Sequence, residues 1–338
     1  MAFDPRDADP RPLDLGRLRG LQACSSPSGR FVVLAMDHRR NLRRELRPSA
    51  PDSVTDDELV GFKRDVVSTL GPRSSAVLLD PEYGLAQCLV ARAVPGSVGL
   101  VVALEATGYV GSPEARRSVI LDGWGVEAAR RAGADAVKLL VYYHPAAPTA
   151  PIQEDLVATT VEACRRLEVA LFLEVLVYAL EPGRALSGAE RRSLVVEAAH
   201  RLGAFGPDVL KCEVPADPGD PEVEIEAACR ELDDAVGIPW TLLSGGVSPA
   251  RFERLVEIAC ETGASGVVVG RAVWGEATRL AGPERQRFLG QEAVARIGRL
   301  TEIVERAARP WWARHPLGSL PEPPPNWYRV SPAVAPSS

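Results

Sequence analysis

The chain has 338 residues, of which 46% are hydrophobic and 25% are charged, and it carries a formal net charge of -6. This composition is typical of a globular protein with a large core, and the negative charge argues against nucleic acid as a partner, because a phosphate backbone attracts a basic surface. No apolar stretch approaches the length of a membrane span, so we expect a cytoplasmic protein with no membrane partner.

Eight short apolar runs recur along the chain, and each is followed by a stretch with helical periodicity. Their near-continuous apolar character is typical of parallel strands that are covered on both faces. Acidic residues begin one helical stretch at Asp56 and Asp57, and glycines end others at Gly133, Gly203 and Gly263. The predicted strands span residues 31–37, 75–80, 99–106, 136–143, 170–178, 209–215, 240–246 and 265–271.

Eightfold alternation of strand and helix predicts an α/β fold of the (β/α)₈ TIM barrel type. The alternative is an open, doubly wound sheet, which normally has fewer units and a glycine-rich turn after its first strand. Here the first strand ends in the sequence Met36-Asp37-His38-Arg39, without a glycine. We therefore expect one barrel domain over residues 16–309.

The two ends of the chain differ from the middle. Residues 1–15 are polar and are predicted to form a loose arm, and residues 310–338 form a tail too rich in proline for a long helix or a central strand. We expect aromatic side chains to pin this tail to a surface or to a neighbouring subunit of a homo-oligomer, and a tail that closes over the active site is the alternative. The aromatic residues are Trp311, Trp312, Trp327 and Tyr328.

Lysine is rare in this sequence. Only three of its 39 Lys and Arg residues are lysines, namely Lys63, Lys138 and Lys211. Arginine stays protonated at working pH and is no amine nucleophile, whereas lysine can become one, so the lysines are candidates for chemistry. By contrast, the six cysteines and four histidines are scattered without metal-ligand spacing, which indicates reduced thiols and predicts no metal site.

Three charged residues lie inside apolar runs on consecutive predicted strands: Lys138 on the fourth, Glu174 on the fifth and Lys211 on the sixth. Consecutive strands are neighbours in this barrel, so the three side chains are predicted to converge. One alternative is a charge network that merely fills the interior, although burying charge is costly. A neutral lysine amine could instead add to a ketone, with the carboxylate moving the substrate's hydroxyl proton.

Glycines follow the last two predicted strands. The seventh ends in Ser244-Gly245-Gly246, and the eighth ends in Gly270-Arg271. Backbone N–H groups of such loops bind anions, and the loops after strands seven and eight commonly bind phosphate in this fold. The sequence therefore predicts a phosphate site to which Arg271 adds a guanidinium, with an ordinary glycine turn as the alternative.

At these residues the chain resembles the tagatose 1,6-bisphosphate aldolase family of class I aldolases, which includes sulfofructose-phosphate aldolases. Matching segments run in order from residue 35 to 274. They are AMDHR (35–39), LLDPEYGL (78–85), EATGY (105–109), GADAVKLLVYY (133–143), FLEVLVY (172–178), DVLKCEVP (208–215), LSGGVS (243–248) and VVGRAVW (268–274).

The resemblance implies a role for each of these residues and requires no cofactor. It makes Lys211 the Schiff-base lysine, Glu174 the acid/base carboxylate, Lys138 an auxiliary lysine and Asp37 a contact to a substrate hydroxyl. It also implies that three residues of the two loops contact the substrate's phosphate, namely Ser244, Gly270 and Arg271. The substrate would be a phosphorylated ketohexose.

The anion at the far end of the sugar stays open, because the family commonly has Gln in place of His38 and Lys in place of Ala106. A bisphosphate or a sulfonate would fit. Lys63 is predicted to lie on a solvated helix face, and its alternative role is to reach that distal anion with His38 or Arg39. Two other functions remain open: a phosphosugar isomerase that uses Glu174 as its base, and a non-catalytic sugar-phosphate sensor.

Overall fold

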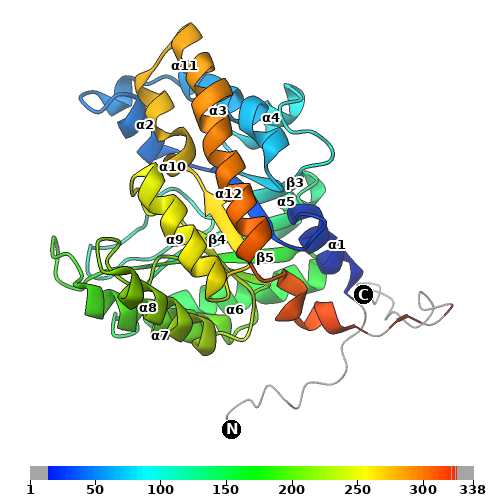
Figure 1. Cartoon of the computed structure of the whole chain (residues 1–338), viewed down its shortest axis with the longest axis vertical. Helices are drawn as coiled ribbons and strands as arrows, with labels where there is room; N and C mark the ends of the chain where they lie inside the picture. The colour runs from blue at the N-terminus through cyan, green and yellow to red at the C-terminus, as the bar shows by residue number, and fades with distance from the viewer. Residues whose placement is uncertain (1–13, 321, 324, 326–338) are drawn as a thin grey trace.

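A computed structural model describes residues 14–320, 322, 323 and 325 of the chain. Its eight strands form a closed barrel of parallel strands in chain order (Figure 1). The predicted barrel is therefore confirmed, and each predicted strand appears. The strands are β1 (Phe31–Met36), β2 (Ala76–Leu79), β3 (Gly99–Ala103), β4 (Ala136–Tyr143), β5 (Ala170–Val177), β6 (Val209–Cys212), β7 (Trp240–Leu243) and β8 (Gly266–Val269).

Helices surround the barrel, with α9 and α12 on the side that faces the viewer in Figure 1. Capping boxes start two of the longer helices, at Thr55 with Glu58 before α3 and at Ser187 with Glu190 before α7. The α-helices are α1 (Leu15–Cys24), α2 (Arg40–Leu46), α3 (Asp56–Leu70), α4 (Leu85–Val90), α5 (Val126–Arg131), α6 (Ala150–Leu167), α7 (Gly188–Gly203), α8 (Glu222–Ala235), α9 (Pro249–Glu261), α10 (Arg271–Trp274), α11 (Gly282–Phe288) and α12 (Val294–Ala307). Within the described residues, none of the helices is long and apolar enough to cross a membrane.

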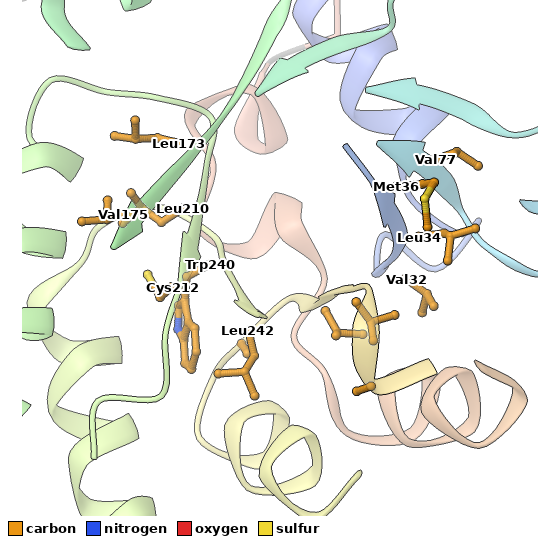
Figure 2. Close-up of a cluster of buried hydrophobic side chains, with 14 of the residues drawn as sticks. Val32, Leu34, Met36, Val77, Leu173, Val175, Leu210, Cys212, Trp240 and Leu242 are labelled. Carbon is orange, nitrogen blue, oxygen red and sulfur yellow. The ribbon is translucent and has the colours of Figure 1, made fainter. Parts of the chain in front are cut away.

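Side chains alternate between two buried apolar layers along most of the strands. One layer lies between the strands and the helices, and Figure 2 shows part of it, including Val32, Leu34 and Met36 of β1. The other layer fills the barrel interior, and the alternate residues of the same strand, such as Phe31 and Ala35, belong to it. Apolar residues on both faces explain why the strands read as continuous apolar runs.

The alternation also explains why four charged residues point into the barrel. Each of them comes two positions after a residue of the interior layer. Because successive side chains on a strand point to opposite faces, residues two positions apart point to the same face. The charged layer therefore lies above the interior apolar layer, toward the carboxyl ends of the strands. The pairs are Ala35 and Asp37, Ala136 and Lys138, Phe172 and Glu174, and Val209 and Lys211.

The opposite end of the barrel is closed by α1 and by the tail. Trp311, of which only 2% is exposed, joins the interior layer, and its backbone N–H donates to the carbonyl of Gly29 at 2.8 Å. The tail thus folds onto this chain's own barrel, at the amino ends of the strands. A tail that closes over the active site is wrong for the described residues 310–320, whereas Trp327 and Tyr328 lie outside the described residues.

Candidate active site

The central charged residues are positioned by the register of the sheet. Glu174 lies directly beside Lys211 in the pairing of β5 with β6, and beside Leu140 in the pairing of β4 with β5. The Nζ atom of Lys211 is 2.8 Å from Oε1 of Glu174, and Nζ of Lys138 is 2.8 Å from Oε2 of the same carboxylate. The structure therefore brings the three predicted residues together around Glu174.

Lys138 has two further carboxylate partners. Its Nζ atom donates to Asp37 Oδ2 at 2.8 Å and to Glu105 Oε1 at 2.7 Å. Burial alone would lower the pKa of Lys138, but the three carboxylates raise that pKa well above its usual value. Lys138 is consequently held as a cation, and it is a poor candidate for the neutral amine that must attack a carbonyl.

Lys211 has a simpler environment. Only 5% of the residue is exposed, and its one charged partner at ion-pair distance among the described residues is Glu174. Three carboxylates surround the Nζ atom of Lys138, whereas a single carboxylate lies against that of Lys211. The two lysines are thus chemically unequal, and the geometry favours Lys211 as the nucleophile.

The carboxylates of the site respond to the same lysines. Burial would raise the pKa of Asp37, but Lys138 and Lys211 lower it well below its ordinary range. Burial would also raise the pKa of Glu174, but the same two lysines outweigh this effect and lower that pKa. Both side chains are therefore carboxylates at neutral pH, which leaves Glu174 ready to accept a proton.

Glu105 completes the cluster, although the sequence analysis gave it no role. It is only 4% exposed, burial raises its pKa, and its Oε2 accepts the backbone N–H of Leu140 at 3.1 Å. A signal was present, because Glu105 follows the interior residue Ala103 by two positions. The predicted third strand extends to residue 106, whereas β3 ends at Ala103, so Glu105 lies just beyond the strand.

The loops after β7 and β8 lie together, as the sequence predicts. Gly245 and Gly246 have φ angles of 56° and 84°, a region that favours glycine. A Cβ atom added to Gly246 would lie 3.8 Å from Nη2 of Arg271, so this guanidinium stands against the glycine turn. The Nη1 atom of Arg271 also donates to Glu45 Oε1 at 3.1 Å.

A groove of about 650 Å³ opens beside these loops. Three arginines face it, Arg44, Arg271 and Arg279, together with Gly246 and Ser248. Gly270, at the end of β8, approaches His38 so closely that an added Cβ would be 3.0 Å from Cε1 of that ring. Ser244 begins the turn, and its carbonyl accepts the N–H of Val247 at 3.3 Å. This arrangement offers N–H and guanidinium donors to an anion.

Lys63 does not lie on a solvated face, and that prediction is wrong. The residue is fully buried, its Nζ atom donates to the carbonyl of Met36 at 2.8 Å, and it forms an ion pair with the buried Asp80. Lys63 follows Leu59 by four positions and precedes Val66 by three, so it belongs to the apolar face of α3. The helical spacing was the signal that the sequence analysis missed.

The described residues bring no group of three or more His, Cys, Asp and Glu side chains into an arrangement that could hold a metal ion. All six cysteines are buried and free. The polar groups that the site does offer are amines, carboxylates and a guanidinium. These groups suit covalent capture of a carbonyl and proton transfer.

Comparisons with known proteins agree with this chemistry. Residues 31–276 match the model of the DeoC/LacD family aldolase. The chain is 30% identical over 310 residues to tagatose 1,6-diphosphate aldolase 2 of Streptococcus pyogenes serotype M1, covering 85% of this chain and 94% of that protein. It is 28% identical over 324 residues to tagatose 1,6-diphosphate aldolase of Listeria monocytogenes serotype 4b, covering 89% and 95%.

A solved structure shares the fold. It is that of a Schiff-base-forming fructose-1,6-bisphosphate aldolase, which matches with a TM-score of 0.57 and 22% sequence identity, over 86% of this chain and 99% of that chain.

Proposed function

Because the chain belongs to the DeoC/LacD family of aldolases, we propose that it is a metal-independent, Schiff-base aldolase that cleaves a phosphorylated ketohexose. The products would be dihydroxyacetone phosphate and a three-carbon aldehyde. The observation that carries the proposal is the unequal pair of lysines on one carboxylate. Lys138 is held as a cation by three carboxylates, whereas Lys211 binds, among the described residues, Glu174 alone. As a lyase, the chain is neither the isomerase nor the sensor considered above.

The first stage forms the covalent intermediate. Glu174 Oε1, at 2.8 Å, takes a proton from the ammonium of Lys211, and the neutral amine adds to the ketone carbon at position 2. The carbinolamine then loses its hydroxyl as water, for which Glu174 returns the proton. The resulting iminium carries the positive charge that makes the next step possible.

The second stage breaks the carbon–carbon bond. Glu174 removes the proton of the hydroxyl at carbon 4, and the electron pair of the bond between carbons 3 and 4 moves into the iminium. The aldehyde leaves, and the remaining enamine is protonated at carbon 3 and hydrolysed, which restores the amine. Lys138 keeps Glu174 in position, and Asp37, anchored by Lys138 at 2.8 Å, is available to bind a substrate hydroxyl.

The phosphate on carbon 1 is assigned to the loops after β7 and β8. Backbone N–H groups of Gly245, Gly246 and Gly270, the hydroxyl of Ser244 and the guanidinium of Arg271 are its proposed donors. The approach of Gly270 to the ring of His38, next to Asp37 of the charged cluster, supports a site in which the phosphate and the reacting carbon lie within one molecule's length.

A substrate panel tests the proposal. The enzyme should release dihydroxyacetone phosphate from tagatose 1,6-bisphosphate and fructose 1,6-bisphosphate, with and without EDTA. Loss of activity in EDTA with rescue by zinc would contradict the Schiff-base chemistry. A preference of more than about tenfold for 6-deoxy-6-sulfofructose 1-phosphate, equal to about 1.4 kcal/mol of transition-state binding, would identify a sulfosugar aldolase instead.

The cellular setting follows from the same proposal. Six buried, free cysteines suit the reducing cytoplasm, where we propose the enzyme acts. A homo-oligomer stays a prediction, which sedimentation or light scattering of the purified protein would test.

A further inference from the structure

A second anion, at the far end of the sugar, would need a cation to bind it, and three candidates for that role are unavailable. Lys63 is fully buried in its ion pair with Asp80. Burial, together with the nearby cations, lowers the pKa of His38 to about 4, so its ring is neutral at pH 7, and the ring stacks edge-on against Trp274. Arg39 is 5% exposed and already donates to Glu82 Oε2 at 2.6 Å and to the carbonyl of Glu105 at 2.7 Å.

A hairpin between β3 and α5 carries a different cation. Its two arms join at the bridges between Glu105 and Ile120 and between Val110 and Arg117. Its base is part of the active site, because Glu105 binds Lys138. A second attachment is Ser118, whose Oγ accepts the backbone N–H of Tyr142 on β4 at 3.2 Å. The hairpin therefore stands at the mouth of the barrel, at the carboxyl ends of β3 and β4.

Arg116, near the end of this hairpin, lies among three tyrosine rings. Its guanidinium carbon is 4.5 Å from the ring centre of Tyr178, 4.9 Å from that of Tyr109 and 5.8 Å from that of Tyr142. Rings at these distances stabilise a cation and fix its position without neutralising it. Its Nε atom donates to the carbonyl of Pro113 at 2.9 Å.

The guanidinium has unused hydrogen-bonding capacity. Among the described residues no carboxylate comes within ion-pair distance of Arg116, and both of its terminal nitrogens lack an acceptor at hydrogen-bonding distance. Most buried or half-buried arginines among the described residues lie within ion-pair distance of a carboxylate, as Arg17, Arg251 and Arg296 do. A half-buried guanidinium that is held in place and not neutralised is suited to bind an anion from solution.

The position of Arg116 matches the expected course of the substrate. In a closed barrel of eight strands in chain order, β4 lies across the axis from β8. A sugar whose first phosphate binds the loops after β7 and β8, and whose carbonyl carbon meets Lys211 on β6, therefore extends its other end toward β3 and β4. Tyr142, one of the three rings around Arg116, lies at the carboxyl end of β4 on that side of the barrel.

We propose that Arg116, held by Tyr109, Tyr142 and Tyr178, binds the anionic group at the far end of the sugar and is a specificity-determining residue of this enzyme. The inference rests on the proposed function and adds to it the residue that binds a tetrahedral oxyanion on carbon 6. Phosphate and sulfonate share this chemistry.

The test compares variants on substrates that differ only in this anion. Arg116→Ala should lower kcat/KM for a ketohexose 1,6-bisphosphate or its 6-sulfonate counterpart by about ten- to a hundredfold, the usual effect of losing a charge-assisted hydrogen bond. The change should fall mainly on KM, and kcat/KM for the matching ketohexose 1-phosphate should stay within about twofold. Arg116→Lys should recover part of the loss.

Arg117→Ala is the matched control, because Arg117 is the adjacent, exposed arginine of the same hairpin and none of the three tyrosines stacks on it. Arg117→Ala should leave kcat/KM for both classes of substrate unchanged. Equal losses of Arg116→Ala on both classes of substrate would mean that Arg116 only supports the hairpin, and no loss on either would also overturn the proposal. Whichever of the two dianionic substrates the wild type prefers identifies the anion.

Borohydride trapping distinguishes a failure of the role proposed for Arg116 from a failure of the proposed function. Dihydroxyacetone phosphate has no distal anion, so borohydride should trap it on the wild type and on Arg116→Ala alike. An enzyme that traps it but shows no selective defect in Arg116→Ala disproves only the role of Arg116. An enzyme that traps nothing and cleaves no ketose phosphate disproves the Schiff-base aldolase itself.

Discussion

Glu174 and Lys211 face each other across neighbouring strands, with 2.8 Å between Oε1 and Nζ. The register of β5 with β6 fixes this pairing, and both residues are less than 7% exposed. A proton can therefore pass between the carboxylate and the amine without movement of a loop. Placement on rigid strands gives the pair the precision that covalent catalysis requires.

Glu174→Gln should lower kcat by about a hundred- to ten-thousandfold, because the amide cannot accept the hydroxyl proton at carbon 4. The fold should be retained, since the amide has almost the volume of the carboxylate. Steady-state kinetics on the preferred ketose phosphate measures the effect.

Glu213→Gln is the control for that variant. Glu213 lies two residues beyond Lys211, but its carboxylate accepts the N–H of Val177 at 2.9 Å and pairs with Arg191. The variant should keep most of the activity. Comparable losses in both variants would point to a general effect of charge removal.

Replacing the two lysines by methionine should have unequal effects on stability. Lys138→Met leaves three carboxylates without their shared cation, and the loss of a buried partner typically costs about 3–5 kcal/mol. Lys211→Met removes the partner of one carboxylate, which Lys138 still binds, and should cost less. Denaturant unfolding measures both, and equal destabilisation would contradict the distribution of charge described here.

Arg271→Ala should reduce kcat/KM by about ten- to a hundredfold through loss of a charge-assisted pair with the first phosphate. The reduction should be much smaller with a substrate that lacks this phosphate. Arg279→Ala, which removes another arginine of the same groove, serves as the comparison. If kcat/KM falls equally in the two variants, Arg271 has no specific contact with the phosphate and the arginines of the groove act only through their positive charge.

The tail should contribute to acid sensitivity through Asp208. Burial opposes ionisation, but His315 and Arg17 lower the pKa of Asp208, with His315 Nε2 at 2.8 Å from Oδ1. A lowered pKa means stability that is present above the ordinary aspartate value of about 4 and is lost as the pH falls through the native value.

Asp208→Asn should therefore destabilise the protein by about 3–5 kcal/mol at pH 7, and the difference from wild type should shrink below about pH 4. Unfolding followed by circular dichroism across this pH range measures it. If the difference in unfolding free energy between the variant and the wild type stays constant down to pH 2, the ionisation of Asp208 contributes nothing to stability.

Much of the architecture was predictable because the barrel repeats one pattern. Continuous apolar runs marked all eight strands, and the order of neighbouring strands was enough to expect Lys138, Glu174 and Lys211 together. Residues in mid-strand are positioned by a register that the sequence pattern already implies. The loops after β7 and β8 were predictable for a similar reason, since their glycines have the positive φ angles that favour this residue.

Other features depend on contacts between distant segments. The ion pair of Lys63 with Asp80 joins a helix to the end of a strand, and the attachment of Trp311 beneath the barrel joins segments more than 280 residues apart. Arg116 meets Tyr142 and Tyr178 from two other segments of the chain, in addition to Tyr109 of its own hairpin. Local periodicity carries no information about contacts between distant segments, so the sequence alone did not predict them.

The most direct test of the account is to identify the lysine that forms the covalent intermediate. Incubation with dihydroxyacetone phosphate and borohydride, followed by peptide mass mapping, should find one reduced adduct, on Lys211. Lys211→Arg should form no adduct and show no turnover while keeping the wild-type circular dichroism spectrum. An adduct on Lys138, or turnover that survives in Lys211→Arg, would contradict the assignment.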